Sequence, residues 1–314
     1  AAFTYCAIIF AGIGAQLFYN FICSFLRAMG DSVTPLMFLL FSTVLNVGLD
    51  LLFILSFGWG VAGAAIATGI SQCVGGLLPL FYFLRPNDSL LRLVRTKLEL
   101  APLVKACTNG SSELMSSISS SVVSMVYNFQ LLEYIGEDGV SAYGVLMYVQ
   151  FIFVAIYIGY SVGCAPVIGY HYGAGNRDEL KNMLRKSALL IGSAGVLLTL
   201  LARLLASPLA SIFVGYDETL HALTEHAFRL FSFSFLLSGF NIFTSAFFTA
   251  LNNGFVSAAI SFLRTLLFQT CCVLVLPVLF DIDGIWWAIT AAEVFAFAIS
   301  LTFLLTKRKK YGYM

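Results

Sequence analysis

Two residues with the chemistry to bind a cation share one face of an otherwise apolar segment. Asp50 lies in the run 35–57, and Asn46 comes four residues earlier, so both lie on the same face of a helix. An Asp near the centre of a bilayer costs about 2.5–3.5 kcal/mol and usually faces a cavity or a partner. Its carboxylate and the Asn amide oxygen suit a hard cation such as Na⁺, and a proton would also neutralise the acid. We predict that Asp50 senses a cation; the alternative is a hydrogen bond that only packs two helices.

A second polar face runs along the segment 106–131. Serine alone would favour close helix packing in a membrane, whereas Glu113 and Asn128 favour the lining of a substrate cavity, and both interpretations stay open. Glu113 begins a row adjacent to the main one. The main row repeats every four residues and consists of Ser112, Ser116, Ser120, Ser124 and Asn128.

Arg264 and Glu293 come from two different apolar runs. Counting 1.5 Å per residue from the ends of those runs places both near mid-depth in the membrane. We predict that they are close enough to pair, directly or through a third group. Their pairing is either structural or part of a substrate or gating site.

Nine apolar runs must position these side chains, because the chain is 60% hydrophobic and only 11% charged. A soluble domain is nearer 45–50% apolar and about 25% charged, so most of this chain is expected in lipid. This excludes an ordinary cytosolic enzyme, and a net charge of +1 excludes a nucleic-acid-binding protein. We predict an all-α integral membrane protein with spans at about 2–26, 35–57, 60–84, 106–131, 140–168, 187–213, 223–250, 254–279 and 284–306.

The basic residues predict an orientation. If the C-terminus lies in the cytoplasm and nine spans alternate, every Lys and Arg outside the spans falls in an inner segment. We therefore expect a multi-pass protein of the plasma membrane, the inner membrane of a bacterium, with the lipid bilayer as its partner. The expected oligomeric state is a monomer.

The chain also carries a weak internal repeat. Asn20 and Ser24 match Asn241 and Ser245. Both asparagines are also candidate cavity residues, because they are polar side chains within apolar spans. The repeated spans are six apart and so keep the same orientation, as in transporters whose substrate site lies between two parallel halves. We predict a parent protein with twelve spans, of which this chain lacks the first three. The expected parts are a three-helix remnant of the N-lobe (1–84), a cytoplasmic amphipathic linker (85–105) and a complete six-helix C-lobe with a basic tail (106–314).

Several motifs taken in order resemble the multidrug and toxic compound extrusion (MATE) transporters. They are LRAMGDSVTP (26–35), LNVGLD (45–50), GWGVAGAAIAT (58–68), PVIGYHYGAGN (166–176) and GIWWA (284–288). The resemblance implies cation-coupled drug efflux by alternating access between two six-helix lobes. It also implies that Asn46, Asp50 and Thr68 match an oxygen-rich cation site of the first lobe, where Na⁺ would bind.

The leading interpretation is thus a secondary-active exporter of amphipathic organic cations, driven by H⁺ or Na⁺ and needing no other cofactor. A related flippase for a lipid-linked precursor is an alternative that several basic cavity residues would favour. A membrane-embedded enzyme would need a nucleophile with its base or a metal motif such as HExxH, and the sequence has none, so we expect no enzyme. A membrane scaffold without transport is the remaining alternative.

Overall fold

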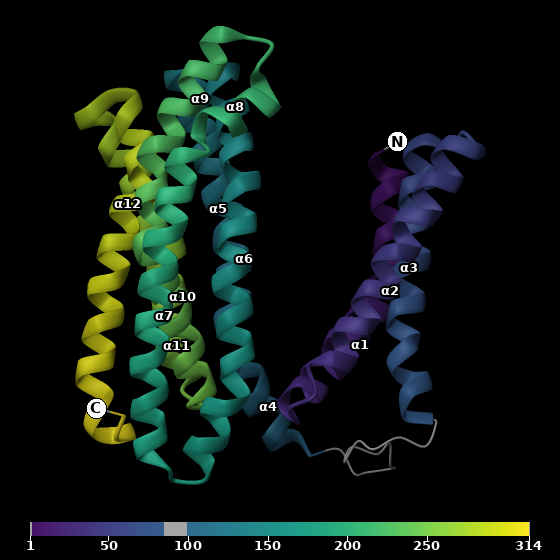
Figure 1. Cartoon of the computed structure of the whole chain (residues 1–314), viewed down its shortest axis with the longest axis vertical. Coiled ribbons are helices and arrows are strands. Elements are labelled where there is room, and N and C mark those ends of the chain that lie inside the picture. The colour runs from purple at the N-terminus through teal and green to yellow at the C-terminus, as the bar shows by residue number, and fades with distance from the viewer. Residues whose placement is uncertain (1, 85–98, 314) are drawn as a thin grey trace. The chain divides into compact units, whose positions relative to one another are not determined.

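The computed structural model describes residues 2–84 and 99–313. The chain divides into two compact units, unit 1 with residues 1–98 and unit 2 with residues 99–314. Every regular element of the described residues is a helix (Figure 1), so the predicted all-α class is confirmed. The predicted division at 84 and 105 stays a prediction, because 85–98 of the expected linker lie outside the described residues.

Unit 1 is built on a central helix. It comprises α1 (Ala2–Ala28), α2 (Val33–Asp50) with its π-helical continuation η1 (Leu51–Ser56), and α3 (Gly60–Leu84). The helix α3 packs against both α1 and α2. The turn before α3 is short because Gly58 adopts a positive φ of 67°, which lets α2 and α3 lie antiparallel.

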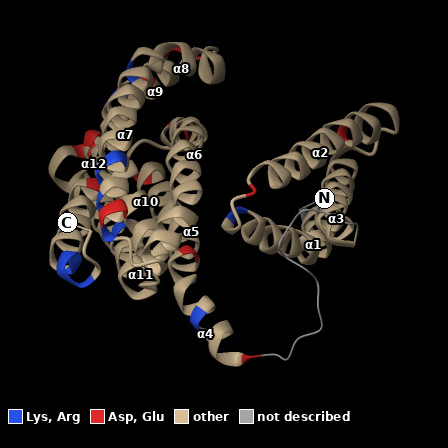
Figure 2. Ribbon diagram, turned by 60° about the horizontal axis from the view of Figure 1, so that its bottom comes forward, with Lys and Arg blue, Asp and Glu red and all other residues tan. Residues whose placement is uncertain are grey.

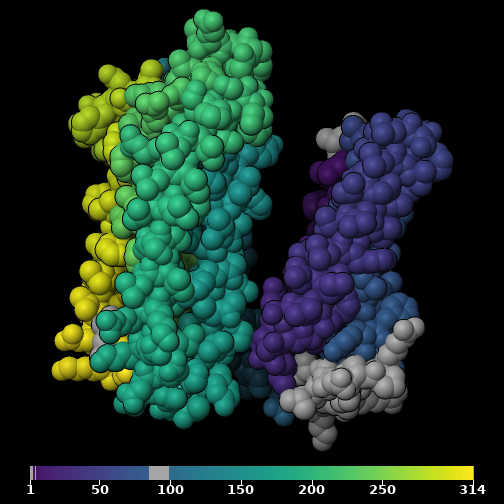
Figure 3. Space-filling model, viewed as in Figure 1, coloured from purple at the N-terminus to yellow at the C-terminus, as the bar shows by residue number. Residues whose placement is uncertain are grey.

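Unit 2 is a bundle around α10. This helix contacts α6, α7, α11 and α12, and it contributes fully buried phenylalanines to a continuous apolar core. Figure 3 shows α7 and α9 covering one face of unit 2, with α12 along its edge. The elements are α4 (Leu100–Asn109), α5 (Ser111–Tyr134), α6 (Glu137–Gly173), α7 (Arg177–Leu204), α8 (Ala206–Val214), α9 (Glu218–Phe231), η2 (Ser232–Ser234), α10 (Phe235–Ala250), α11 (Gly254–Phe262), η3 (Leu263–Phe268) and α12 (Gln269–Tyr311).

By length and composition, seven helical stretches of the described residues are apolar enough to cross a membrane. One of them, Gly254–Tyr311, holds two expected spans. Its backbone leaves helical geometry at Phe280 and Asp281, and Gly284 lies against the carbonyl of Leu276, so the chain reverses there. The helix α5 is as long as a span but too rich in serine to be counted. The number nine stays a prediction.

Charged residues are sparse along the helices and gather near their ends (Figure 2). In unit 2, one end holds the α6–α7 turn, the α10–α11 turn and the C-terminus; we call it the basic end because Arg177 and residues 307–310 lie there. The C-terminal tail closes this end. Asn253 Nδ2 in the α10–α11 turn donates to Tyr311 Oη at 2.9 Å, and Tyr313 is fully buried.

At the opposite end, Asp217 caps α9. Its Oδ1 accepts hydrogen bonds from the hydroxyl of Thr219 (2.6 Å) and from the backbone N–H groups of Thr219 (2.9 Å) and Leu220 (3.1 Å). These bonds favour the ionised acid and lower the pKa of Asp217, with the Thr219 hydroxyl the largest cause. Because the folded pKa lies below the unfolded value of about 3.9, the stabilisation is complete above that pH and disappears as pH falls through the folded pKa.

We therefore expect Asp217→Ala to lower the unfolding temperature at neutral pH, because the first turn of α9 loses its acceptor. The difference from the unsubstituted protein should vanish in strong acid. Thermal unfolding in detergent at both pH values measures it. A difference that persists in acid would contradict this account, and Asp217→Asn, which keeps an acceptor oxygen for the first turn of α9, is the control.

Candidate functional site

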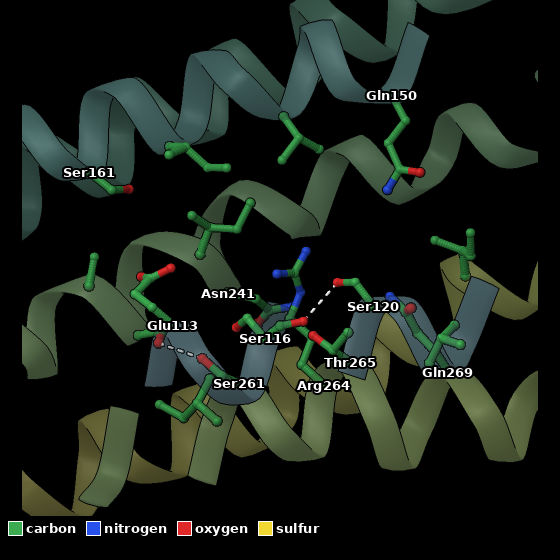
Figure 4. A pocket seen from close by; sticks show the side chains of 18 of the residues that line it. Glu113, Ser116, Ser120, Gln150, Ser161, Asn241, Ser261, Arg264, Thr265 and Gln269 are labelled. Atoms are coloured by element: carbon green, nitrogen blue, oxygen red, sulfur yellow. Dashed lines mark hydrogen bonds between the residues drawn. The ribbon is translucent and has the colours of Figure 1, made fainter. Parts of the chain in front are cut away.

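A partly open polar cavity of about 300 Å³ lies in unit 2, lined by residues of α5, α6, α10, α11, η3 and α12. That volume is at the small end of the range for ligand pockets. Figure 4 shows Glu113 and Ser261 at one end of the cavity and Gln150 and Gln269 at the other. The cavity is amphipathic, because aliphatic side chains of α6 and α10 alternate with these polar groups.

The serine row of α5 forms part of the wall. Ser116, Ser120 and Ser124 line the cavity, and the Ser120 hydroxyl donates to the Ser116 carbonyl at 2.8 Å. The ends of the row lie elsewhere. Ser112 is buried, and Asn128 lines a separate shallow depression with Glu137. The middle of the row therefore lines the cavity and its first member is packed in the protein, while the role of this row in substrate binding stays a prediction.

Two charged side chains line the cavity, Glu113 from the first turn of α5 and Arg264 from η3. No hydrogen bond or ion pair joins the Glu113 carboxylate to another described residue. Arg264 differs, because Glu293 of α12 neutralises it: Nη2 donates to Oε1 at 2.6 Å, and Nε donates to Oε1 and Oε2 at 2.9 and 3.1 Å. The net charge of the cavity is therefore that of Glu113.

The pairing of Arg264 with Glu293, predicted from depth alone, is confirmed. Glu293 is 2% exposed and stands behind Arg264 without lining the cavity. Its carboxylate also accepts from Asn241 Nδ2 of α10 at 2.7 Å, and Ser300 Oγ donates to Asn241 Oδ1 at 3.0 Å. Four side chains from α10, η3 and α12 thus form one buried network, of which only Asn241 and Arg264 reach the cavity.

The predicted cation residues lie in unit 1. Asp50 ends α2, directly before the π-helical turn η1, and it is half-buried like Asn46. Asp50 Oδ1 and Asn46 Nδ2 are both buried without a hydrogen-bond partner among the described residues. An unpaired buried oxygen on an acid costs free energy unless something binds it, so this atom fits a cation or a proton.

The packing of α2 on α3 relates Thr68 to these residues. Ser42 Oγ donates to the Ser71 carbonyl at 2.8 Å, and a Cβ on Gly63 would meet the Phe53 side chain. Between those contacts the antiparallel register puts Thr68 near the level of Asn46. The Thr68 hydroxyl donates to its own helix at the Ala64 carbonyl (2.9 Å). Its share in a cation site stays a prediction. Asn20 is exposed on α1 and donates to the Gln16 carbonyl (3.0 Å), so its cavity role also stays a prediction.

Several cavity residues were not predicted from the sequence: Tyr143, Ser161, Ser245, Ser261 and Thr265. A usable signal was present, because the four-residue spacing noticed in α5 recurs in α10 and in α11 with η3. Polar residues at that spacing are Asn241, Ser245 and Thr249 on α10, and Ser257, Ser261 and Thr265 on α11 and η3.

Long apolar helices around an amphipathic cavity with one unpaired carboxylate define a class, the helical membrane transporters. The MatE family model matches residues 114–273, about half of the chain, and the chain belongs to this family. The resemblance inferred from the sequence motifs is therefore confirmed.

The curated relatives of this chain are consistent with its membership of the MatE family. Multidrug export protein MepA of Staphylococcus saprophyticus is 26% identical over 97% of this chain and 67% of its own length. The probable multidrug resistance protein YpnP of Bacillus subtilis is 50% identical over 26% of this chain and 18% of its own length. The chain thus spans about two thirds of the first relative, and 63% of MepA from Staphylococcus aureus.

Solved structures share the fold. An outward-facing multidrug resistance MATE transporter matches with a TM-score of 0.92 at 21% identity, over 99% of this chain and 70% of its own. A transporter of the MOP superfamily from Pyrococcus furiosus matches with a TM-score of 0.89 at 22% identity, over 98% and 69%. At these identities the likeness concerns the fold alone.

Proposed function

We propose that this protein exports amphipathic organic cations across the plasma membrane, driven by H⁺ or Na⁺, through alternating access between two lobes. Family membership and the multidrug export proteins among its relatives support this function. It acts as a transporter and not as an enzyme, as a monomer with its C-terminus in the cytoplasm, and it needs no cofactor besides the coupling ion. Asp50, Asn46 and Thr68 hold that ion.

The single observation that supports a cationic substrate is the charge of the cavity in unit 2. Glu113 is unpaired within the described residues, whereas Arg264 is neutralised by Glu293. A ligand with a positive group and a flat apolar body would place the charge at Glu113 and the body against the aliphatic and aromatic wall. A lipid-linked precursor with phosphates would need several free basic groups, and the described lining offers none.

We expect Glu113→Gln to weaken binding of a monovalent organic cation about tenfold or more, because a charged hydrogen bond is worth about 1.5–3 kcal/mol. Binding of a neutral analogue of the same shape should not change. Fluorescence titration of the protein in detergent measures both dissociation constants.

Glu133→Gln is the matched control, since Glu133 is exposed on the same helix, as Glu113 is, but lies outside the cavity. An acid in the first turn of a helix also stabilises that helix, so the variant should be checked for a normal unfolding temperature. Equal loss of affinity for cation and neutral analogue would refute the charge-based role of Glu113.

A further inference from the structure

Arg264 has a hydrogen-bonding edge that its ion pair with Glu293 does not use. The Glu293 carboxylate accepts from Nε and Nη2 of the guanidinium, so two of the three nitrogens are occupied. No hydrogen bond joins the third nitrogen, Nη1, to another described residue, and Nη1 is not completely buried. An arginine carries two N–H groups on that nitrogen, and both are therefore free to donate.

The free edge of the guanidinium belongs to the cavity of unit 2. Arg264 lines this cavity, whereas Glu293 stands behind it and does not. The side chain of Arg264 is 17% exposed and that of Glu293 only 2%, so the unoccupied nitrogen is on the open side of the pair. Figure 4 shows Arg264 between Glu113 at one end of the cavity and Gln269 at the other. A ligand that fills the cavity therefore passes Nη1.

The buried network holds this edge in one orientation. Glu293 bonds Nε and Nη2 together, which fixes the plane of the guanidinium. The Glu293 carboxylate is held in turn by Asn241, which accepts from Ser300. Arg264 also lies in the π-helical turn η3, and such turns are rare and occur frequently at functional sites. Because little side-chain freedom is left to lose, a hydrogen bond from Nη1 to a ligand costs little ordering.

The other polar groups of the cavity are less selective. The side-chain amides of Gln150 and Gln269 line it without a hydrogen bond to another described residue, but each amide can donate or accept. The hydroxyls of Ser245 and Ser261 lie 3.0 Å apart and bond each other. Nη1 of Arg264 differs, because a guanidinium donates and never accepts. It therefore selects a ligand that presents an acceptor.

A separate observation indicates a polar occupant in the same cavity. Ser161 of α6 lines the cavity, is 2% exposed, and its hydroxyl has no partner among the described residues. A buried hydroxyl without a partner is costly, so a polar ligand or a water molecule is expected to bind it. A purely apolar ligand body would leave both this hydroxyl and Nη1 unsatisfied.

The charges around the cavity decide which kind of acceptor fits. Glu293 already cancels the charge of Arg264, and the Glu113 carboxylate is unpaired among the described residues. A carboxylate or a phosphate on the ligand would therefore enter a cavity of net negative charge. A carbonyl oxygen meets no such repulsion, and it still accepts from a charged donor, which is a stronger bond than one between two neutral groups.

We propose that Arg264 is a specificity-determining residue whose Nη1 donates to an uncharged oxygen acceptor, such as a ketone or amide carbonyl, on an amphipathic organic cation. The substrate class is then a cation that also carries a carbonyl group, with its positive group at Glu113 and its carbonyl at Arg264. This inference rests on the proposed function, because it requires the cation to bind in this cavity.

Two organic cations that differ in one group test the inference. They are para-benzoylphenyltrimethylammonium, which has a ketone between its rings, and para-benzylphenyltrimethylammonium, which has a methylene there. Isothermal titration calorimetry of the protein in detergent measures both dissociation constants. We expect the unsubstituted protein to bind the ketone about tenfold more tightly or better, which is the order of the contribution of a hydrogen bond to a charged group.

Arg264→Lys keeps a positive charge beside Glu293 but has a single nitrogen, which Glu293 occupies, so we expect it to lose the preference for the ketone. Its affinity for the methylene compound should change little. The double variant Arg264→Met with Glu293→Gln removes the buried charge together with its partner, and it should lose the preference as well. Arg229→Lys is the matched control and should keep the preference, because Arg229 pairs with Glu225 at 2.6 Å outside the cavity.

A normal unfolding temperature shows that the variants are folded. A preference for the ketone that persists in both variants of Arg264 would mean that another group binds the carbonyl, which overturns the inference. Equal binding of the two cations by the unsubstituted protein also overturns it. An equal loss of affinity for both cations in the variants would mean that Arg264 only supports the shape of the cavity, with the same consequence. If the unsubstituted protein binds neither cation, the proposed function fails as well.

Discussion

Glu293→Ala is expected to lower the free energy of unfolding by about 3–5 kcal/mol, because it leaves the Arg264 guanidinium buried without its counter-charge. The side chain of Arg264 is only 17% exposed, so water screens little of that cost. Asn241 would lose an acceptor at 2.7 Å in the same step. Unfolding in mixed micelles, followed by circular dichroism, measures the change.

The double variant Arg264→Met with Glu293→Gln should recover most of this loss. Methionine removes the buried charge, and glutamine keeps an acceptor for Asn241. Glu225→Ala is the matched control: Glu225 pairs with Arg229 at the same 2.6 Å, but Arg229 is 56% exposed, so we expect less than about 1 kcal/mol. If Glu293→Ala and Glu225→Ala lower the free energy of unfolding equally, burial does not explain how much the Arg264–Glu293 pair contributes to stability.

Asp50→Asn is expected to abolish ion-driven efflux while the cation still binds at the cavity of unit 2. The substitution keeps the shape of the side chain but removes the group that gains or loses charge. One charge moving through 100 mV is worth about 2.3 kcal/mol, or about 50-fold in a concentration ratio, and the variant should lose accumulation of that order. Everted membrane vesicles with an imposed pH or Na⁺ gradient measure the accumulation of a fluorescent cation.

Asp31→Asn provides the control within unit 1. Asp31 lies in the α1–α2 turn and accepts a hydrogen bond from the Thr34 backbone N–H at 3.0 Å, which an asparagine can replace. Efflux should be unchanged. Coupled efflux that persists in Asp50→Asn would refute the role of Asp50, and the gradient that drives the unsubstituted protein identifies the coupling ion.

Much of the architecture is readable from the sequence, because lipid leaves few solutions for a backbone. Every buried N–H and C=O must be paired within its own segment, so long apolar runs become helices, and Gly and Asn mark the turns. Depth along a helix follows from counting residues, and for this reason the approach of Arg264 to Glu293 was predictable from position alone. The family likeness likewise rests on motifs that follow one another in the chain.

Which side of one helix packs against another helix could not be predicted from the sequence in this way. Asn241 was a candidate only as a polar residue within an apolar span, and its bonds to Glu293 and Ser300 depend on how α10 and α12 are rotated against each other. The hydroxyls of Ser245 and Ser257 have the spacing of ordinary packing residues. Only the crossing of α10 over α11 brings them to 2.9 Å.

The sequence by itself determined that this is a helical membrane protein of the MATE type, with acids and serines at stated depths, because composition and period are properties of one segment. The tertiary structure alone decided which acids remain unpaired and how the buried network is completed. It leaves Glu113 unpaired within the described residues, adds Asn241 and Ser300 to the predicted Arg264–Glu293 pair, and places Asp50 directly before the π-helical turn η1 and Arg264 within η3. The physical reason is that electrostatic balance and helix rotation are set by contacts between distant segments, which a single sequence does not encode segment by segment.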